Sequence, residues 1–290
     1  MGSVGDLVMP CVDDPTNLSQ PTMASDVHPR RIALGVAYDG SGWSGWQTQP
    51  GGNTVQDCLE GALSKFAGVK LPTICAGRTD TGVHALCQVV HVDAPFAREP
   101  MAWVKGLNSH LPPSVSIQWA VPVEAAFHAR FSAQSRSYTY VILNTPVRHP
   151  LWAGRAGWCF RALDEQRMNE AAQLLLGEHD FSSFRSSQCQ AATPVRTMTH
   201  ASVSRQGVFV VLKFTANAFL HHMIRNLVGE LVYLGQGRTD MPHFASVLDA
   251  RDRRRAAPTY AAGGLYLSGV QYPPELLQLP SQPDILPLLV

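Results

Sequence analysis

The 290-residue chain contains no run of eighteen apolar residues, so it offers no segment long enough to cross a membrane as a helix. It begins without the basic and then apolar layout of a secretory signal, and we therefore expect a cytoplasmic protein with no membrane partner. Its six cysteines lie far apart without a C-x-x-C pair, which favours reduced thiols over a disulfide framework or a zinc site. Hydrophobic residues make up 45% and charged residues 16%, which excludes wholesale disorder, a collagen-like repeat and a coiled coil.

Basic residues are missing from both ends of the chain. Residues 1–29 contain four aspartates and residues 275–290 contain two acids, and neither segment has a Lys or Arg. The formal net charge of +1 therefore conceals 23 basic and 16 acidic residues in 30–274, a net charge of +7. Nineteen of the 23 are Arg, whose planar guanidinium binds phosphate and stacks on bases. This charge favours a nucleic-acid partner, although a generally Arg-rich composition would explain the count equally well.

The order of hydrophobic patterns along the chain is typical of an α+β protein. A capping box at Thr54–Asp57 predicts the start of a helix, and Gly68 predicts its end. Helical spacing predicts helices at 55–66, 100–107 and 164–175, and another that begins at Asn217. Apolar patterns of alternating or continuous type predict strands at 32–38, 86–92, 115–121, 137–143, 198–203, 208–214 and 264–270.

These elements are predicted to form two similar mixed α/β halves, with largely antiparallel sheets flanked by helices. The N-terminal half spans residues 30–124 and the C-terminal half spans residues 125–272. Residues 1–29, rich in Pro, Ser and Asp without periodicity, are predicted to be a disordered tail. Residues 273–290 contain five prolines and are predicted to run as an extended tail over the surface.

The segment from Gly77 to Ala85 has the highest density of chemically active residues. Two glycines bracket Arg78 and Asp80 in a loop before a strand, so the backbone can turn sharply and present a carboxylate beside a guanidinium. A nearby cation keeps an aspartate ionised, and an ionised aspartate can act as a nucleophile or a base. On chemistry alone, a surface turn with a local Arg–Asp pair is the commoner explanation.

The same segment, Gly77-Arg78-Thr79-Asp80-Thr81-Gly82-Val83-His84-Ala85, resembles the signature of the tRNA pseudouridine synthase A family. Other segments resemble motifs of that family in the same order along residues 30–272. These are Tyr38-Asp39-Gly40-Ser41-Gly42-Trp43-Ser44-Gly45-Trp46-Gln47-Thr48-Gln49, the segment 127–133 followed by Arg136-Ser137-Tyr138-Thr139-Tyr140, and 217–226. Both tails fall outside the resemblance and inherit no role from it.

The resemblance implies a pseudouridine synthase fold with an RNA cleft between the two halves. It implies an isomerase that converts uridine to pseudouridine at nucleotides 38 to 40 of the tRNA anticodon stem-loop. It further implies a homodimer that needs no cofactor and no metal. Two other classes are a catalytically silent RNA-binding protein and a metal-dependent nuclease, which would need clustered carboxylates or His ligands.

By this resemblance Asp80 is the catalytic nucleophile, and Arg225 is the basic residue that pairs with it. The sequence leaves open whether Asp80 attacks C1′, adds at C6 or removes the C2′ proton. Tyr138 matches the family's active-site tyrosine, which stacks on the target base. Its alternative is a tyrosine of the sheet core that shares a face with Tyr140.

Two further residues receive a role in substrate binding from the resemblance. Arg78 would either steady Asp80 or enter the RNA stem to help flip the target nucleotide, a step that costs a few kcal/mol of unstacking. Leu265 matches an apolar residue that lines the uracil pocket, and packing in a core strand is the equally natural alternative.

Three other features are ambiguous in the sequence. His221, His222 and Arg225 share the spacing of one helix face, which predicts a polar patch, a solvated face, or a metal site without a recognisable third ligand. The Trp43 and Trp46 loop could stack on RNA, close over the pocket or pack in a hairpin. The run Arg251-Asp252-Arg253-Arg254-Arg255 is predicted to be a solvated face or a phosphate contact.

Overall fold

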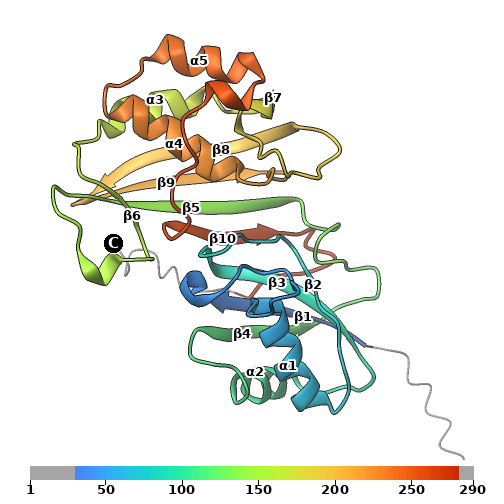
Figure 1. Ribbon diagram of the computed structural model, residues 1–290. Helices are drawn as coiled ribbons and strands as arrows, with labels where there is room; N and C mark the ends of the chain where they lie inside the picture. The colour runs from blue at the N-terminus through green and yellow to red at the C-terminus, as the bar shows by residue number, and fades with distance from the viewer. Residues whose placement is uncertain (1–29, 281–290) are drawn as a thin grey trace, which may run out of the picture.

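A computed structural model describes residues 30–280 of the protein. The predicted N-terminal tail, 1–29, lies outside the described residues, as do residues 281–290 of the predicted C-terminal tail. Within the described range the chain forms the α+β fold expected from its patterns, with a mostly antiparallel sheet flanked by helices. Figure 1 shows the strands stacked in one continuous series.

The ten-stranded sheet has the order β4-β1-β3-β10-β5-β9-β8-β7, with β2 added to β3 and β6 added to β5. The strands of its first part are β1 (Arg30–Tyr38), β2 (Ile74–Cys75), β3 (His84–Ala94) and β4 (Val115–Pro122). Those of its second part are β5 (Ser135–Asn144), β6 (Gly157–Cys159), β7 (Gly177–Asp180), β8 (Val195–Gln206), β9 (Phe209–Ala216) and β10 (Leu265–Gln271).

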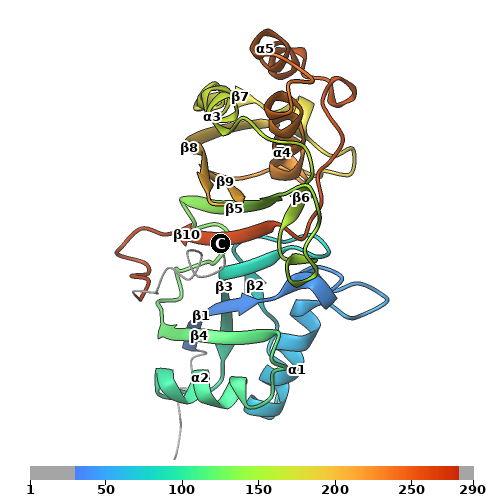
Figure 2. The same ribbon diagram turned by 90° about the vertical axis from the view of Figure 1, so that its left-hand side faces the viewer.

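The helices gather at the two ends of the sheet (Figures 1 and 2). Helices α1 (Val55–Ala67) and α2 (Pro100–Asn108) lie at the β4 end, and α3 (Glu165–Gln173), α4 (Met223–Gly235) and α5 (Met241–Ala250) lie at the β8 end. Their ends follow local chemistry: the Thr54 side chain accepts a hydrogen bond from the Asp57 amide, and Gly68 adopts the left-handed conformation. Both predicted boundaries of this helix are therefore confirmed. None of the helices formed by residues 30–280 has the length and apolar character that crossing a membrane requires.

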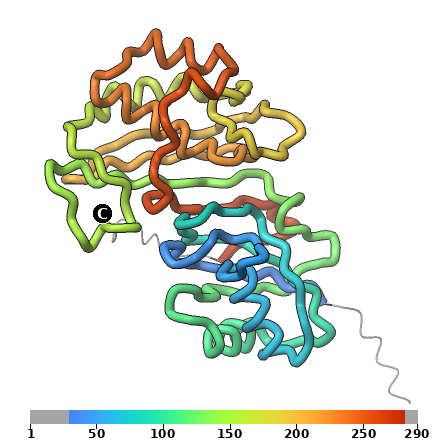
Figure 3. Tube along the Cα trace, viewed as in Figure 1, coloured from blue at the N-terminus to red at the C-terminus, as the bar shows by residue number. Residues whose placement is uncertain are grey.

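Strand β10 joins the two parts of the sheet, although it is the last strand in chain order. It pairs in parallel with β3, where Tyr266 lies opposite His84, and antiparallel with β5, where Leu267 lies opposite Tyr138. Figure 3 shows the orange-red C-terminal chain descending from α5 to lie between the cyan and green segments. The sheet is thus continuous across both predicted halves.

Two predictions differ from the structure: the start of one helix and the path of the chain after β10. Helix α4 begins at Met223 and not at Asn217, because His222 adopts a left-handed conformation with φ of 63° that interrupts any helix before it. The segment 273–280 does not run extended over the surface. The amides of Leu276 and Leu277 bond to the Pro273 carbonyl in a turn, and Leu277, 4% exposed, packs into the core. Burying this leucine removes apolar surface from water, which an extended path would leave exposed.

Gly264 sits where β10 enters the sheet, and the close backbone approach there requires glycine. A Cβ at this position would lie 2.5 Å from the Val141 carbonyl oxygen and 2.6 Å from the Gly157 nitrogen. We expect Gly264→Ala to lower the free energy of unfolding by about 1–3 kcal/mol, as overpacking does in other cores. Urea denaturation measures this loss.

The control is Gly51→Ala, because a Cβ on Gly51 meets nothing within 4 Å. This variant should stay within about 0.5 kcal/mol of the natural protein. Equal stability of the two variants would contradict the close packing at the start of β10.

Candidate active site

Asp80 lies in the loop between β2 and β3, and the backbone of that loop is fixed on both sides of it. The Val83 amide donates to the Asp80 carbonyl at 3.1 Å, which closes a turn in which Gly82 has φ of 79°. On the other side, the Thr79 hydroxyl hydrogen-bonds to the Tyr38 hydroxyl at 2.8 Å. The turn therefore presents the Asp80 side chain from a backbone with few alternative conformations.

The glycine-rich loop after β1 packs directly against this turn. The Trp46 amide donates to the Thr79 carbonyl at 3.0 Å, and a Cβ on Gly45 would lie 2.7 Å from the same oxygen. Trp46 is only 1% exposed, so its indole belongs to the core. The suggestion that Trp46 stacks on RNA is therefore wrong, and its packing supports the Asp80 loop instead.

Three nitrogen-bearing side chains surround the Asp80 carboxylate. Arg225 Nη1 donates to Oδ2 at 3.1 Å, His221 Nε2 lies 3.3 Å from Oδ1, and His222 Nε2 lies 3.4 Å from Oδ2. The Asp80 side chain is 23% exposed, so the pair is partly shielded from water. The structure thus brings together Asp80 and Arg225, which are far apart in the sequence.

Arg225 is held in place by a second bond. Its Nε donates to the Tyr260 carbonyl at 2.9 Å, and the Tyr260 amide donates to the Arg225 carbonyl at 3.1 Å. His222 is the residue immediately before α4, and His221 precedes it. The predicted polar patch exists, but it arises from the first turn of α4 together with the left-handed His222 and not from the spacing of one helix face.

Tyr138 lies on β5 with its hydroxyl toward the Asp80 loop. The oxygen is 3.7 Å from the place that a Cβ on Gly77 would occupy, and the ring packs edge-on against Phe219 with centroids 5.1 Å apart. Burial raises the pKa of Tyr138 well above its ordinary value, and the Asp80 charge raises it further. The hydroxyl is therefore protonated at neutral pH and can donate a proton or a hydrogen bond.

The two remaining residues from the sequence analysis lie in different environments. Leu265 is 5% exposed at the start of β10, opposite Tyr140 in the register. Arg78 is exposed, and within residues 30–280 its guanidinium forms no ion pair with Asp80. Of the two arginines proposed to steady Asp80, it is Arg225 that pairs with the carboxylate in the structure.

Arg136 and His84 hold the site together, and the sequence analysis gave neither a role. The Arg136 guanidinium donates to the carbonyls of Ala76 and Asn217, both at 3.0 Å, and so joins the Asp80 loop to the segment before α4. His84 Nδ1 accepts from the Gly40 amide at 3.0 Å, and its Nε2 donates to the Gly154 carbonyl at 2.7 Å. Both residues lie inside the quoted motifs, which was the only signal the sequence held.

Asp80, His221 and His222 could also hold a metal ion, because one ligand atom from each lies within 4.8 Å of the others. The third ligand that the histidine spacing lacked is thus supplied by a distant loop. Arg225, however, shares the same carboxylate, and its positive charge opposes a bound cation.

Comparisons with known proteins point in one direction. A model of the family described as tRNA pseudouridine synthase matches residues 35–132 and 171–273. The tRNA pseudouridine synthase A of Bordetella petrii is 62% identical over 247 residues, covering 84% of this chain and 92% of that protein. The protein of the same name from Bordetella avium is 59% identical, with coverage of 86% and 94%, and that from a Janthinobacterium species is 54% identical, with coverage of 87% and 94%.

The contact between Asp80 and His222 predicts a coupled titration. Burial lowers the pKa of His222 below its ordinary value, whereas the Asp80 carboxylate acts in the opposite direction by favouring the imidazolium. Asp80→Asn removes the charge and keeps the shape, so the pKa of His222 should fall further. An NMR titration of the imidazole measures the midpoint, with the exposed Asp249→Asn as a control. A midpoint that stays in place would show that the two groups do not interact.

Proposed function

The chain belongs to the tRNA pseudouridine synthase family, which isomerises uridine to pseudouridine in tRNA, and from that premise we propose how its residues act and where on the tRNA they do so. The reaction breaks the N1–C1′ glycosidic bond, turns the uracil while it is bound and joins C5 to C1′. It transfers no electrons and needs no external group, so no cofactor is expected.

A single carboxylate surrounded by nitrogen donors is the observation that carries the proposal. Asp80 is the acid of the loop, and Arg225 holds it at 3.1 Å. Glycosidases, which hydrolyse O-glycosidic bonds, use two carboxylates and admit water. One carboxylate suits an isomerase that must retain the base, and Asp80 serves as its nucleophile.

The neighbouring side chains receive roles that fit their environments. Tyr138 stacks on the target uracil, and its protonated hydroxyl donates toward the reacting base. Leu265 lines the uracil pocket from the start of β10. Arg78, exposed and free of the Asp80 carboxylate, enters the RNA stem when the target nucleotide flips out and fills the vacated space.

Phosphate contacts supply most of the affinity for tRNA. Residues 30–274 carry a net charge of +7, and Arg255 is exposed. The Arg251–Arg255 run does not act as one patch. Arg253 turns inward to donate to Asn226 Oδ1 at 3.1 Å, and Arg254 is paired with Asp252 at 2.7 Å. Arg251 Nε lies 3.6 Å from Asp180 Oδ2, so Arg255 is the arginine of this run without an ion pair among the described residues and remains as its phosphate contact.

The target nucleotides are positions 38 to 40 of the anticodon stem-loop, and the enzyme works in the cytoplasm. Shape-directed binding supports modification at adjacent positions, because the backbone of a stem changes little between neighbours. An isolated uridine supplies neither phosphates nor a stem and should not react.

The enzyme acts as a homodimer, and an exposed apolar surface formed by the β5–β6 connection and the residue that follows β6 supports this. Val147 is 75% exposed, Leu151 is 74% exposed and Phe160 is 57% exposed. Beside them lies a hollow of about 320 Å³ lined by Leu143, Trp152 and others, which shares no residue with the Asp80 site. Exposed apolar patches of this kind mark interfaces between proteins.

Asp80→Asn should abolish pseudouridine formation while tRNA binding survives. The change removes the nucleophile and keeps its shape, so the rate should fall below about a thousandth of the natural rate. Tritium release from uridine-labelled tRNA measures the rate, and mapping of the product tests positions 38 to 40. Measurable turnover above that limit would exclude Asp80 as the nucleophile.

The same assay separates the rival functions. A silent RNA-binding protein would bind tRNA and release no tritium. A metal-dependent nuclease that used Asp80, His221 and His222 would cleave RNA and lose activity with a chelator. Pseudouridine formation should instead persist when EDTA is present.

Leu151→Asp should shift the protein toward monomers, because a charge placed in an apolar interface is left without a partner. Sedimentation velocity measures the mass in solution. Met101→Asp is the matched control, since Met101 is 58% exposed and lies on α2, outside the β5–β6 surface. A natural protein that sediments as a monomer would refute the dimer itself.

A further inference from the structure

Phe131 is exposed on a turn whose backbone is tightly bonded. The side chain is 76% exposed, and one face of its ring stacks on His128 with centroids 4.3 Å apart and planes 28° apart. Exposing so large an apolar ring to water forgoes the stabilisation that its burial would give. A flexible loop could fold the ring inward, so the rigidity of the turn decides whether the exposure is maintained.

The turn is fixed by its own histidine. His128 Nδ1 accepts hydrogen bonds from the amides of Arg130 at 3.2 Å and Phe131 at 3.1 Å. The amide of Ser132 donates to the His128 carbonyl at 2.9 Å, and the Ser132 hydroxyl accepts from the His128 amide at 3.0 Å. Few backbone groups of the turn are left to form another conformation.

Groups from neighbouring strands tie the turn to the rest of the protein. The Tyr272 hydroxyl donates to the Ala129 carbonyl at 2.6 Å. Arg136 Nη2 donates to the Arg130 carbonyl at 2.6 Å and, at 3.0 Å, to the carbonyl of Ala76, which precedes Asp80 in the same loop. The Phe131 turn and the Asp80 loop are therefore joined by one guanidinium.

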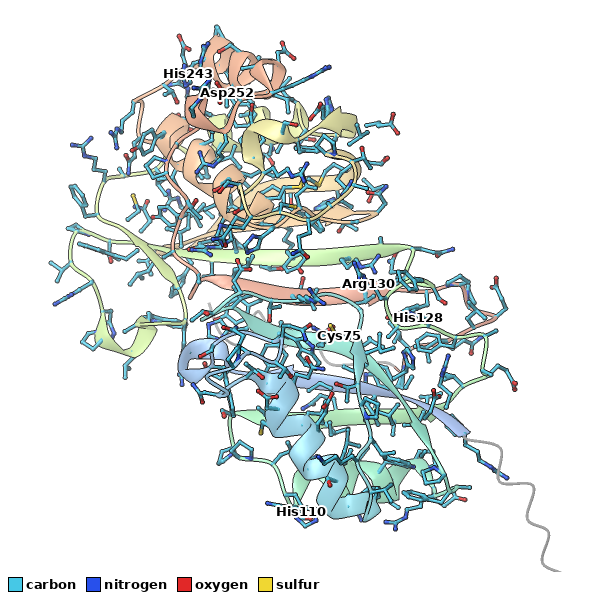
Figure 4. The ribbon with its side chains drawn as sticks, turned by 45° about the vertical axis from the view of Figure 1, so that its right-hand side comes forward. Cys75, His110, His128, Arg130, His243 and Asp252 are labelled. Atoms are coloured by element: carbon cyan, nitrogen blue, oxygen red, sulfur yellow. The ribbon has the colours of Figure 1, made fainter. Side chains whose placement is uncertain are left out.

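The charge around the ring is positive. The Arg130 guanidinium lies 5.5 Å from the Phe131 ring centroid, within the range of a cation–π contact. Arg130 and Arg78 are both exposed, and neither forms an ion pair with any residue from 30 to 280. Burial raises the pKa of the Cys75 thiol, and Arg78 and Arg130 both act to lower it, so both guanidiniums lie within electrostatic range of that residue. Figure 4 shows His128 and Arg130 on one side of the molecule, with Cys75 nearby.

We propose that Phe131 is a stacking platform for an unpaired nucleobase of the bound tRNA, with Arg130 on the adjoining phosphate. This inference rests on the proposed function, because tRNA is the substrate that brings the base. An exposed aromatic face beside unpaired arginines matches the way proteins hold single-stranded nucleotides. Bases inside a duplex are already stacked on both faces, so the occupant is a nucleotide outside a stem.

The first test is tRNA affinity measured by filter binding. Phe131→Ala should weaken binding about 5- to 100-fold, the range for loss of one stacked base, and Phe131→Trp should restore it. Met101→Ala, a change at another exposed apolar residue, should leave the affinity unchanged. Because Phe131 does not touch Asp80, single-turnover rates at saturating tRNA should stay within a few-fold of the natural rate. Natural affinity in Phe131→Ala, with pseudouridine formation intact, would overturn the platform and leave the proposed function standing.

The second test finds what lies on the ring. A photoreactive benzoylphenylalanine at position 131 should crosslink to one unpaired nucleotide of tRNA, identified by sequencing the adduct. A crosslink to a second copy of the chain would identify the surface as a protein interface and overturn the proposal. If the natural enzyme formed no pseudouridine, the proposed function would fall by itself, and the crosslink would still report whether RNA stacks at this position.

Discussion

The pairing of β10 with both β3 and β5 is the constraint on which the site depends. β3 follows the Asp80 loop, and β5 carries Tyr138, so the strand between them sets the spacing of the Asp80 carboxylate and the Tyr138 ring. The chain that leads into β10 also passes Tyr260, whose carbonyl holds the Arg225 side chain. One strand thus positions elements from three parts of the sequence.

The electrostatic arrangement follows from this geometry. The Asp80 carboxylate lies beside one guanidinium and two imidazoles and is partly shielded from water. Its electrostatic interactions are therefore stronger than they would be in bulk water. The nearby tyrosine hydroxyl, by contrast, is kept protonated by burial. The site therefore holds an anion and a proton donor side by side, a separation of roles that enzymes often obtain by giving similar groups different surroundings.

Much of the fold could be predicted because its signals are local. The capping box at Thr54 and the strand patterns at 198–203 and 208–214 depend on residues close together in sequence, and all of them appear in the structure. The meeting of Asp80 with Arg225 followed only from the family motifs, since no periodicity connects residues so distant. The left-handed His222 was missed because tertiary contacts override helical spacing there.

Arg136 and Arg253 show most clearly which side-chain roles could not be predicted from the sequence. In the sequence, Arg136 and Arg253 look like surface cations, yet each donates to inward-facing carbonyl or amide oxygens. A guanidinium has five donors, and a folded backbone often leaves several carbonyls to be satisfied at one point. A count of basic residues treats these arginines as charge available to RNA. In the structure their guanidiniums instead donate hydrogen bonds to oxygens of the protein itself.

The central position of β10 in the sheet affects how the protein folds during its synthesis on the ribosome. Synthesis proceeds from the N-terminus, so the Asp80 loop, β3 and β5 all emerge before the strand that joins them. Until residues 265–271 leave the exit tunnel, β3 and β5 each present an unpaired edge, and the carboxylate lacks its final geometry. A nascent chain can therefore contain the whole signature loop without yet being active. A messenger RNA truncated before the codons of β10 yields a protein with unpaired strand edges, which is prone to degradation.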